Sequence, residues 1–102
     1  MYGHNCKEKG KIKVTYGTGS SIMMNTGDTL YLSKYGLSTS IAWRANGRTS
    51  YVLEGNINYT GAVISWLKDQ LGLISSTVEV EDLAQKANSA DTTYIVPAFS
   101  GL

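Results

Sequence analysis

The glycines and hydroxyls at residues 15–21 are the part of this sequence best suited to bind a ligand. The stretch reads Thr-Tyr-Gly-Thr-Gly-Ser-Ser, and Gly17 and Gly19 let the backbone turn sharply and let a ligand approach it closely. The amides of such a turn can form a concave site for an anion, and Thr18 adds a hydroxyl donor. This chemistry suits the phosphate of a nucleotide. The same pattern also builds a β-hairpin with a bulge, so both interpretations stay open on these residues alone.

Two common phosphate-binding motifs are excluded for this stretch. No Lys-Ser or Lys-Thr pair follows the glycines, so it is not a P-loop, and the third glycine of a dinucleotide fingerprint would fall on Ile22. A nucleophilic pair of Cys6 and His4 is the alternative chemistry, because residues i and i+2 of a strand share a face. These are the only cysteine and the only histidine, so the sequence has too few such ligands for a zinc site.

Composition bounds the class of protein. A length of 102 residues predicts one domain, and 42% hydrophobic with 17% charged residues is a globular balance that has fewer charges than usual. The net charge of +1 gives no electrostatic footprint for nucleic acid. A small basic cluster is interrupted by Glu8 and predicts a solvated strand edge; its members are Lys7, Lys9, Lys11 and Lys13.

The expected location is the cytoplasm. The single cysteine excludes an internal disulfide and favours a reducing compartment. The sequence has no secretory segment and no apolar run near the roughly 18 residues that a membrane span needs. We therefore expect neither a nucleic acid nor a membrane as a partner.

The first half of the chain has the patterns of antiparallel strands. Strands are expected at residues 12–16, 21–25, 39–44 and 49–54, with a further short edge strand at residues 29–32. Asn46-Gly47 lies between two of these runs, and this dipeptide is a strong hairpin signal because both residues tolerate positive φ. These elements predict an antiparallel meander of four or five strands.

The second half changes to helical spacing. A first helix is indicated by Ile57, Ile64, Leu67, Leu71 and Ile74, with Asn56 or Asn58 as its cap and Gly72 at its end. A second is indicated by the capping-box pair Ser76 and Glu79, followed by Val80, Leu83, Ala84 and Ala87. Gly61 near the start of the first helix suits close packing, or contact between a ligand and the backbone.

A final buried strand is expected at residues 92–96, where Pro97 stops it. The order of a meander, two helices and a strand predicts an α/β fold that resembles a ribonuclease-H-like half-domain. Residues 1–4 lead almost directly into structured sequence, and residues 98–102 finish on apolar and turn residues with no polar tail. We therefore expect an excised piece of a longer protein.

Several motifs follow one another in order and span nearly the whole chain. They are residues 13–19, 23–27, 36–43, 51–55, Gly61-Ala62 before Trp66-Leu67, and 96–102, which read Val-Pro-Ala-Phe-Ser-Gly-Leu. Together they resemble the FGGY carbohydrate kinases, and their Tyr-Gly-Thr-Gly form is similar to the glycerol kinase-like branch. Each motif is weak by itself, but their joint order and spacing make a specific signal.

The resemblance implies two actin-like, ribonuclease-H-like domains with a cleft between them. It implies transfer of the γ-phosphoryl group of ATP, with Mg²⁺, to a hydroxyl of a sugar or polyol. Residues 1–102 would be one fragment, the opening segment of the C-terminal domain of this family. Thr18 would match the family threonine that contacts the nucleotide phosphates, between Gly17 and Gly19, and Gly61 would match the family glycine near the nucleotide.

The chain also departs from the family pattern. Ser65 stands where glycerol kinases usually carry a glutamine that contacts the nucleotide. The catalytic aspartate of the family would lie upstream of Met1, so no residue of this chain is assigned as catalytic. The carboxylates here are interpreted as turn, strand-end or surface charges: Asp28, Glu54, Asp69 and Asp91. The fragment alone should therefore be inactive, should bind nucleotide only weakly, and could associate with itself through exposed apolar patches.

A different class of protein is the alternative. A non-enzymatic nucleotide-binding regulator or scaffold of the actin-like superfold would share the same fold, because fold does not determine function. A Gly-Asp pair a few residues upstream of Tyr2 in the parent gene would favour the kinase, and its absence would favour the regulator.

Overall fold

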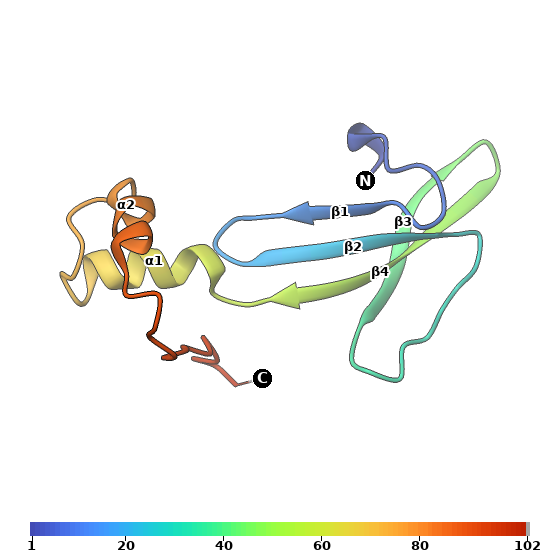
Figure 1. Cartoon of the computed structure of the whole chain (residues 1–102). Coiled ribbons are helices and arrows are strands. Elements are labelled where there is room, and N and C mark those ends of the chain that lie inside the picture. Colours follow the sequence, from blue (N-terminus) through green and yellow to red (C-terminus); the bar gives the residue numbers. More distant parts are fainter. Residues whose placement is uncertain (102) are drawn as a thin grey trace. The chain divides into compact units, whose positions relative to one another are not determined.

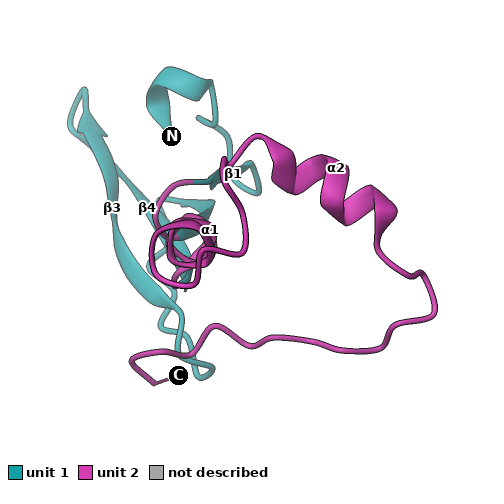
Figure 2. Cartoon of the chain, turned by 90° about the vertical axis from the view of Figure 1, so that its left-hand side faces the viewer, with its two compact units in different colours: residues 1–16, 20–57 teal, residues 17–19, 58–102 magenta. Residues whose placement is uncertain are grey.

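A computed structural model describes residues 1–101. It contains a short 3₁₀ helix at Tyr2–His4, four strands and two α-helices (Figure 1). The strands are β1 (Ile12–Thr15), β2 (Ser20–Gly27), β3 (Ser38–Ala45) and β4 (Arg48–Ile57), and the helices are α1 (Thr60–Asp69) and α2 (Glu79–Lys86). The chain divides into two compact units (Figure 2): unit 1 is Met1–Tyr16 with Ser20–Ile57, and unit 2 is Gly17–Gly19 with Asn58–Leu102. Each unit is described by itself.

Unit 1 is a four-stranded antiparallel sheet in the order β1-β2-β4-β3 (Figure 1). The antiparallel strands confirm the prediction, but the simple meander order is wrong. β4 pairs with β2 from Ser20↔Ile57 to Gly27↔Tyr51, and so it separates β2 from β3. The connection through residues 28–37 carries the chain to the far edge, and local sequence patterns do not contain this long-range pairing.

The predicted edge strand at residues 29–32 does not form. Side chains bind the backbone there in place of a neighbouring strand. The Thr26 hydroxyl donates to the carbonyl oxygen of Thr29 (2.8 Å), and the Thr39 hydroxyl donates to that of Tyr31. These bonds fix a loop, because hydroxyls that satisfy backbone carbonyls compete with the ladder of a sheet.

The hairpin between β3 and β4 has the turn that the sequence predicts. Asn46 has a φ of 50° and Gly47 a φ of 73°, so both lie in the left-handed region that a two-residue hairpin turn requires. The flanking pair Ala45↔Arg48 closes the ladder directly beside the turn. The dipeptide therefore sets the register of the two strands.

Replacing Gly47 with Ala should destabilise this hairpin. A Cβ at positive φ costs about 1–2 kcal/mol, and open space around Gly47 means that backbone conformation is the main cause. Urea unfolding of the chain measures the change in its free energy of unfolding. Asn46→Gly is the matched control, because glycine accepts the same turn, and an equal loss in both variants would contradict this account.

The two faces of the sheet differ in character. The pairs Ile12↔Met24 and Val14↔Ile22 place four apolar side chains on one face, and all four are 36–55% exposed. Among the described residues Val52 is the buried apolar side chain, at 1% exposed. This unit therefore has a small interior and a wide apolar surface.

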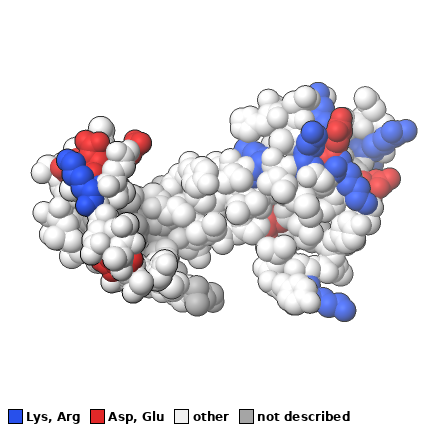
Figure 3. Space-filling view, viewed as in Figure 1, with Lys and Arg blue, Asp and Glu red and all other residues white. Residues whose placement is uncertain are grey.

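Charge is unevenly divided between the units. Unit 1 has seven basic and three acidic side chains, whereas unit 2 has two basic and five acidic ones. On the face in Figure 3, Lys and Arg side chains gather at the N-terminal segment and the β3–β4 hairpin, which both belong to unit 1. The net charge of +1 is thus the average of two unlike parts.

Both predicted helices form in unit 2, with shifted bounds. α1 begins at Thr60, later than expected, because Ile57 still belongs to β4; neither Asn56 nor Asn58 caps it. The N-cap residue is Tyr59, in the left-handed conformation and without a side-chain capping bond. Beyond the helix, Gly72 has a φ of 60°, and the Leu73 amide donates back to the Leu67 carbonyl oxygen (3.0 Å).

The capping box predicted for the second helix is present in its main part. The Ser76 amide donates to a carboxylate oxygen of Glu79 (2.7 Å), and the Val78 amide donates to the Ser76 hydroxyl oxygen (3.1 Å). Two backbone donors near the start of α2 are satisfied in this way.

The predicted buried strand at residues 92–96 is wrong. Tyr94, Ile95 and Val96 are 69–89% exposed, and they pair with no strand among the described residues. The segment instead begins with a local turn, in which the Thr93 amide donates to the Asp91 carboxylate (2.8 Å). Hydrogen bonds from the side chain and then the backbone of Thr93 lower the pKa of Asp91. A strand needs a partner for its backbone groups, and this segment has none in the part of the chain that the structure describes.

In residues 1–101, neither helix has the length and apolar character needed to span a membrane.

Candidate functional site

The tip of the β1–β2 hairpin carries the glycines and the threonine singled out above. Residues 17–19 link the end of β1 to Ser20, the first residue of β2, whose side chain is buried. Thr18 is exposed at the tip. Gly17 and Gly19 are not among the glycines with positive φ, so a left-handed turn is not what requires them. Their lack of side chains instead keeps the backbone of the tip open.

This tip is held by the start of α1, which belongs to the same compact unit. The Gly61 amide donates to the Gly17 carbonyl oxygen (2.9 Å), and the Ala62 amide donates to the Thr18 carbonyl oxygen (3.0 Å). The Thr60 hydroxyl adds a longer contact to the Gly17 oxygen (3.4 Å). The carbonyls of the hairpin thus point at the helix.

This docking explains how α1 begins without a side-chain cap. The first amides of a helix have no partner within it and are normally satisfied by a capping side chain, water or a ligand. Here two of them are satisfied by carbonyl groups of a distant hairpin. The hairpin tip and the first turn of α1 therefore form one backbone-bonded structure.

The predicted site residues lie in two places along this structure. Gly17, Thr18, Gly19 and Gly61 come together at the junction of the hairpin and α1. Ser65 lies four residues beyond Gly61, which is one turn along the same face of α1, and it is exposed. Local patterns did not indicate Thr60 and Ala62, because their role arises from a contact made 43 and 44 residues away in sequence.

The tip offers donors suited to an anion. The amides of Thr18 and Gly19 have no backbone acceptor among the described residues, and the Thr18 hydroxyl lies beside them. The positive end of the α1 dipole adds a favourable field for negative charge near this point. The tip therefore presents two backbone amides and one hydroxyl as hydrogen-bond donors.

Four carboxylates have partners outside the hairpin tip, namely Asp28, Glu54, Asp69 and Asp91. Glu54 accepts a hydrogen bond from the Ser21 hydroxyl (2.5 Å), and Asp69 forms an ion pair with Lys68 (3.3 Å). Asp28 accepts a hydrogen bond from the Thr29 hydroxyl, and Asp91 accepts one from the Thr93 backbone amide. Residues 1–101 contain no group of three His, Cys, Asp or Glu side chains that could hold a metal ion.

The alternative pair of Cys6 and His4 is not assembled. The Cys6 thiol contacts the carbonyl oxygens of His4 and Ile12, each at 3.6 Å, and not the imidazole of His4. Both thiol contacts are to backbone oxygens, so this arrangement gives the cysteine no general base.

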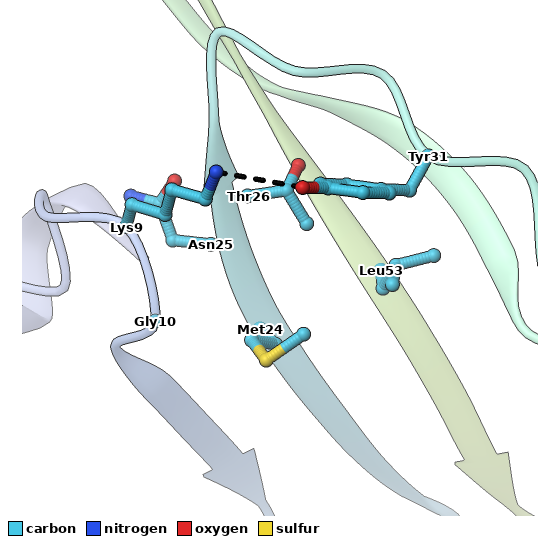
Figure 4. Close-up of a pocket in the computed structure, with 7 residues that line it drawn as sticks. All are labelled: Lys9, Gly10, Met24, Asn25, Thr26, Tyr31 and Leu53. Atoms are coloured by element: carbon cyan, nitrogen blue, oxygen red, sulfur yellow. Dashed lines mark hydrogen bonds between the residues drawn. The ribbon is translucent and has the colours of Figure 1, made fainter.

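Cavities in both units were not foreseen from the sequence. One in unit 1 has a volume of about 190 Å³ and is crossed by a hydrogen bond from the Lys9 ammonium to the Tyr31 hydroxyl (3.4 Å; Figure 4). Another lies in unit 2, has a volume of about 370 Å³ and is lined by Tyr59, Ala62, Trp66 and Phe99. Each of these is built by residues far apart in sequence, which single-sequence patterns do not connect.

Comparison with known proteins assigns the family. Residues 12–102 match the family model described as the FGGY family of carbohydrate kinases, C-terminal domain. The chain belongs to this family. Over all 102 residues it is 49% identical to a glycerol kinase of Burkholderia pseudomallei and 51% identical to one of Carboxydothermus hydrogenoformans. In each case the match covers 20% of the relative, so the chain spans about a fifth of the length of these relatives.

The fold agrees with this assignment. A crystal structure of Plasmodium falciparum glycerol kinase with ADP superposes with a TM-score of 0.72 at 36% identity, covering 83% of this chain and 17% of that one. The antiparallel four-stranded sheet followed by two helices is thus the fold of the matching part of a glycerol kinase, consistent with the actin-like, ribonuclease-H-like class expected above.

Proposed function

We propose that this chain is part of an ATP-dependent carbohydrate or polyol kinase of the glycerol kinase-like branch. The intact enzyme would transfer the γ-phosphoryl group of ATP to a hydroxyl of its acceptor. The observation that carries the proposal is the hairpin tip, which is fixed on the start of α1 with the Thr18 hydroxyl exposed. Family membership and similarity to a glycerol kinase crystallised with ADP support it.

In this proposal the hairpin contacts the phosphates of the nucleotide. The Thr18 hydroxyl donates a hydrogen bond to a phosphate oxygen, and the amides of Thr18 and Gly19 add backbone donors. Gly61 and Ser65 line the same side along α1, and serine has a shorter reach than the glutamine usual at that position. Such a wall suits phosphoryl transfer, in which positioning and charge stabilisation supply most of the catalysis.

The remaining parts of the site would come from outside this chain. Magnesium is typically bound by one or two carboxylates together with substrate phosphates, and the described residues contain no group of three His, Cys, Asp or Glu side chains that could hold a metal ion by itself. We therefore place the Mg²⁺ ligands and the catalytic aspartate in the remainder of the kinase. The chain alone would be inactive and would bind nucleotide weakly.

We also infer the setting of the intact protein. Its partners would be ATP or ADP and a sugar or polyol, and its location the cytoplasm. The exposed apolar face of the sheet would pack against the remainder of the kinase, and in the isolated chain the same face would favour self-association. Light scattering of the purified chain measures that association.

The test is a phosphorylation assay of the intact protein with ATP and a panel of glycerol, other polyols and pentuloses. The expected result is ATP-dependent phosphorylation of at least one acceptor, lost in the Thr18→Ala variant. Absence of activity on every acceptor, in a protein that is folded, would overturn the kinase proposal and favour a non-enzymatic nucleotide-binding regulator or scaffold.

A further inference from the structure

The geometry points to Gly61 as a positioning residue for the tip of the β1–β2 hairpin. Because Gly61 has no side chain, the Gly17 carbonyl group can approach the backbone of α1 closely. This inference rests on the proposed function, because it concerns how the nucleotide-contacting tip is held. The Gly61 amide donates its hydrogen bond to the hairpin. Gly61 therefore acts on the nucleotide through the position of Thr18.

Two backbone hydrogen bonds hold the hairpin tip on the first turn of α1. Gly61 and Ala62 are the second and third residues of α1, and their amides would be without partners in an isolated helix. They donate to the carbonyl oxygens of Gly17 and Thr18, at 2.9 and 3.0 Å. Two consecutive bonds to two consecutive carbonyls fix both the position and the direction of the tip.

The space around Gly61 is too small for a side chain. A Cβ built on Gly61 would lie 2.3 Å from the Gly17 carbonyl oxygen and 3.0 Å from its carbon. Both atoms belong to the backbone, so no side-chain rotation relieves the overlap. Any larger residue at position 61 must push the hairpin away from α1 and disrupt these two hydrogen bonds.

The other glycines make this requirement specific to one position. Gly61 has no positive φ, so a special backbone conformation does not explain it. A Cβ on Gly17 would lie 3.4 Å from the carbonyl oxygen of Gly19, which is an ordinary contact, and one on Gly3 would meet nothing within 4 Å. Among these three, only Gly61 is required by close approach of two backbones.

The contact between Gly61 and the hairpin also determines where Thr18 lies. Its carbonyl is bonded to Ala62, so the residue is held from the backbone while its exposed side chain is left to reach a ligand. Displacing the Gly17 carbonyl would therefore move the Thr18 hydroxyl. Misplacement of a contact group by about 1 Å can reduce catalysis by up to about a hundredfold.

The first experiment needs no variant. Hydrogen–deuterium exchange of the intact protein, without nucleotide, should show the Gly61 and Ala62 amides protected and those of Thr18 and Gly19 exchanging fast. Addition of ADP should slow exchange at Thr18 and Gly19 and leave Gly61 and Ala62 unchanged. Protection of the Gly61 amide that appears only with ADP would overturn the inference, because it would make this amide a direct nucleotide contact.

The second experiment separates positioning from a general loss of structure. Gly61→Ala should raise the KM for ATP about tenfold, leave the KM for the acceptor unchanged and speed exchange at Ala62. Gly3→Ala is the matched control and should alter none of these. An unchanged KM for ATP in Gly61→Ala, or an equal rise in both KM values, would contradict the inference. Protected Gly61 and Ala62 amides in a protein without kinase activity would instead contradict the proposed function alone.

Discussion

Replacing Thr18 with Val is expected to lower kcat/KM for ATP by about 10- to 100-fold in the intact kinase. Valine keeps the branched shape of threonine and removes only the hydroxyl. A hydrogen bond to a charged group contributes about 1.5–3 kcal/mol, and each 1.4 kcal/mol corresponds to about a factor of ten. The effect should appear with ATP varied at saturating acceptor, because the hydroxyl is proposed to contact the phosphates.

Two variants act as controls for Thr18→Val. Thr18→Ser retains a hydroxyl and should retain most of the activity. Thr15→Val makes the same change in β1 of the same hairpin, where the hydroxyl oxygen already accepts a hydrogen bond from the Lys13 ammonium (2.7 Å), and it should leave kcat/KM near its original value. If Thr18→Val and Thr15→Val had equal kinetics, Thr18 would have no special part in nucleotide binding.

Local features of the fold could be predicted from the sequence because their causes are local. The Asn46-Gly47 turn follows from the tolerance of two adjacent residues for positive φ, and the start of α2 follows from a side chain that reaches three residues back. Alternation in the strands marked their positions to within a few residues. Each of these signals is complete within a short window of sequence.

The predictions of the fold that are wrong concern the pairing of strands that are distant in sequence. The position of β4 between β2 and β3 depends on pairing with β2 across the intervening residues 28–47, and no pattern within β4 distinguishes its neighbours. Residues 92–96 have the composition of a buried strand, yet Tyr94 is 89% exposed because no described segment pairs with it. β-branched and aromatic residues thus indicate suitability for a sheet, and a partner decides whether the strand forms.

The residues of the candidate site also divide into those that local sequence patterns indicate and those that they do not. The hairpin tip could be recognised from residues 17–19 because glycines and a hydroxyl are adjacent in sequence. The reason for Gly61 could not, since close packing and ligand contact both require a small residue at that position. A Cβ built on Gly61 would lie 2.3 Å from the Gly17 carbonyl oxygen, which favours close packing against the hairpin. That contact exists only in the folded chain.

Replacing Asn25 with Ala is the substitution expected to destabilise the chain most. Asn25 is completely buried in β2, at a bulge where the register with β4 shifts. Its side-chain amide donates to the Cys6 carbonyl oxygen (3.0 Å), and its side-chain oxygen accepts from the Gly27 amide (2.7 Å). Alanine leaves both backbone groups without these partners, and each such loss costs about 1–3 kcal/mol, so a total of roughly 2–4 kcal/mol is expected.

Urea unfolding of the chain measures this loss, with Asn58→Ala as the matched control. Asn58 is exposed, so the same substitution there should change the free energy of unfolding by no more than about 0.5 kcal/mol. Asn25→Asp gives a finer test, because it retains an acceptor for the Gly27 amide but places a carboxylate oxygen against the Cys6 carbonyl. Since the remaining backbone bonds of Asn25 with Gly10 and Lys11 persist in every variant, a loss below about 1 kcal/mol in Asn25→Ala would mean that those bonds alone hold the N-terminal segment on β2.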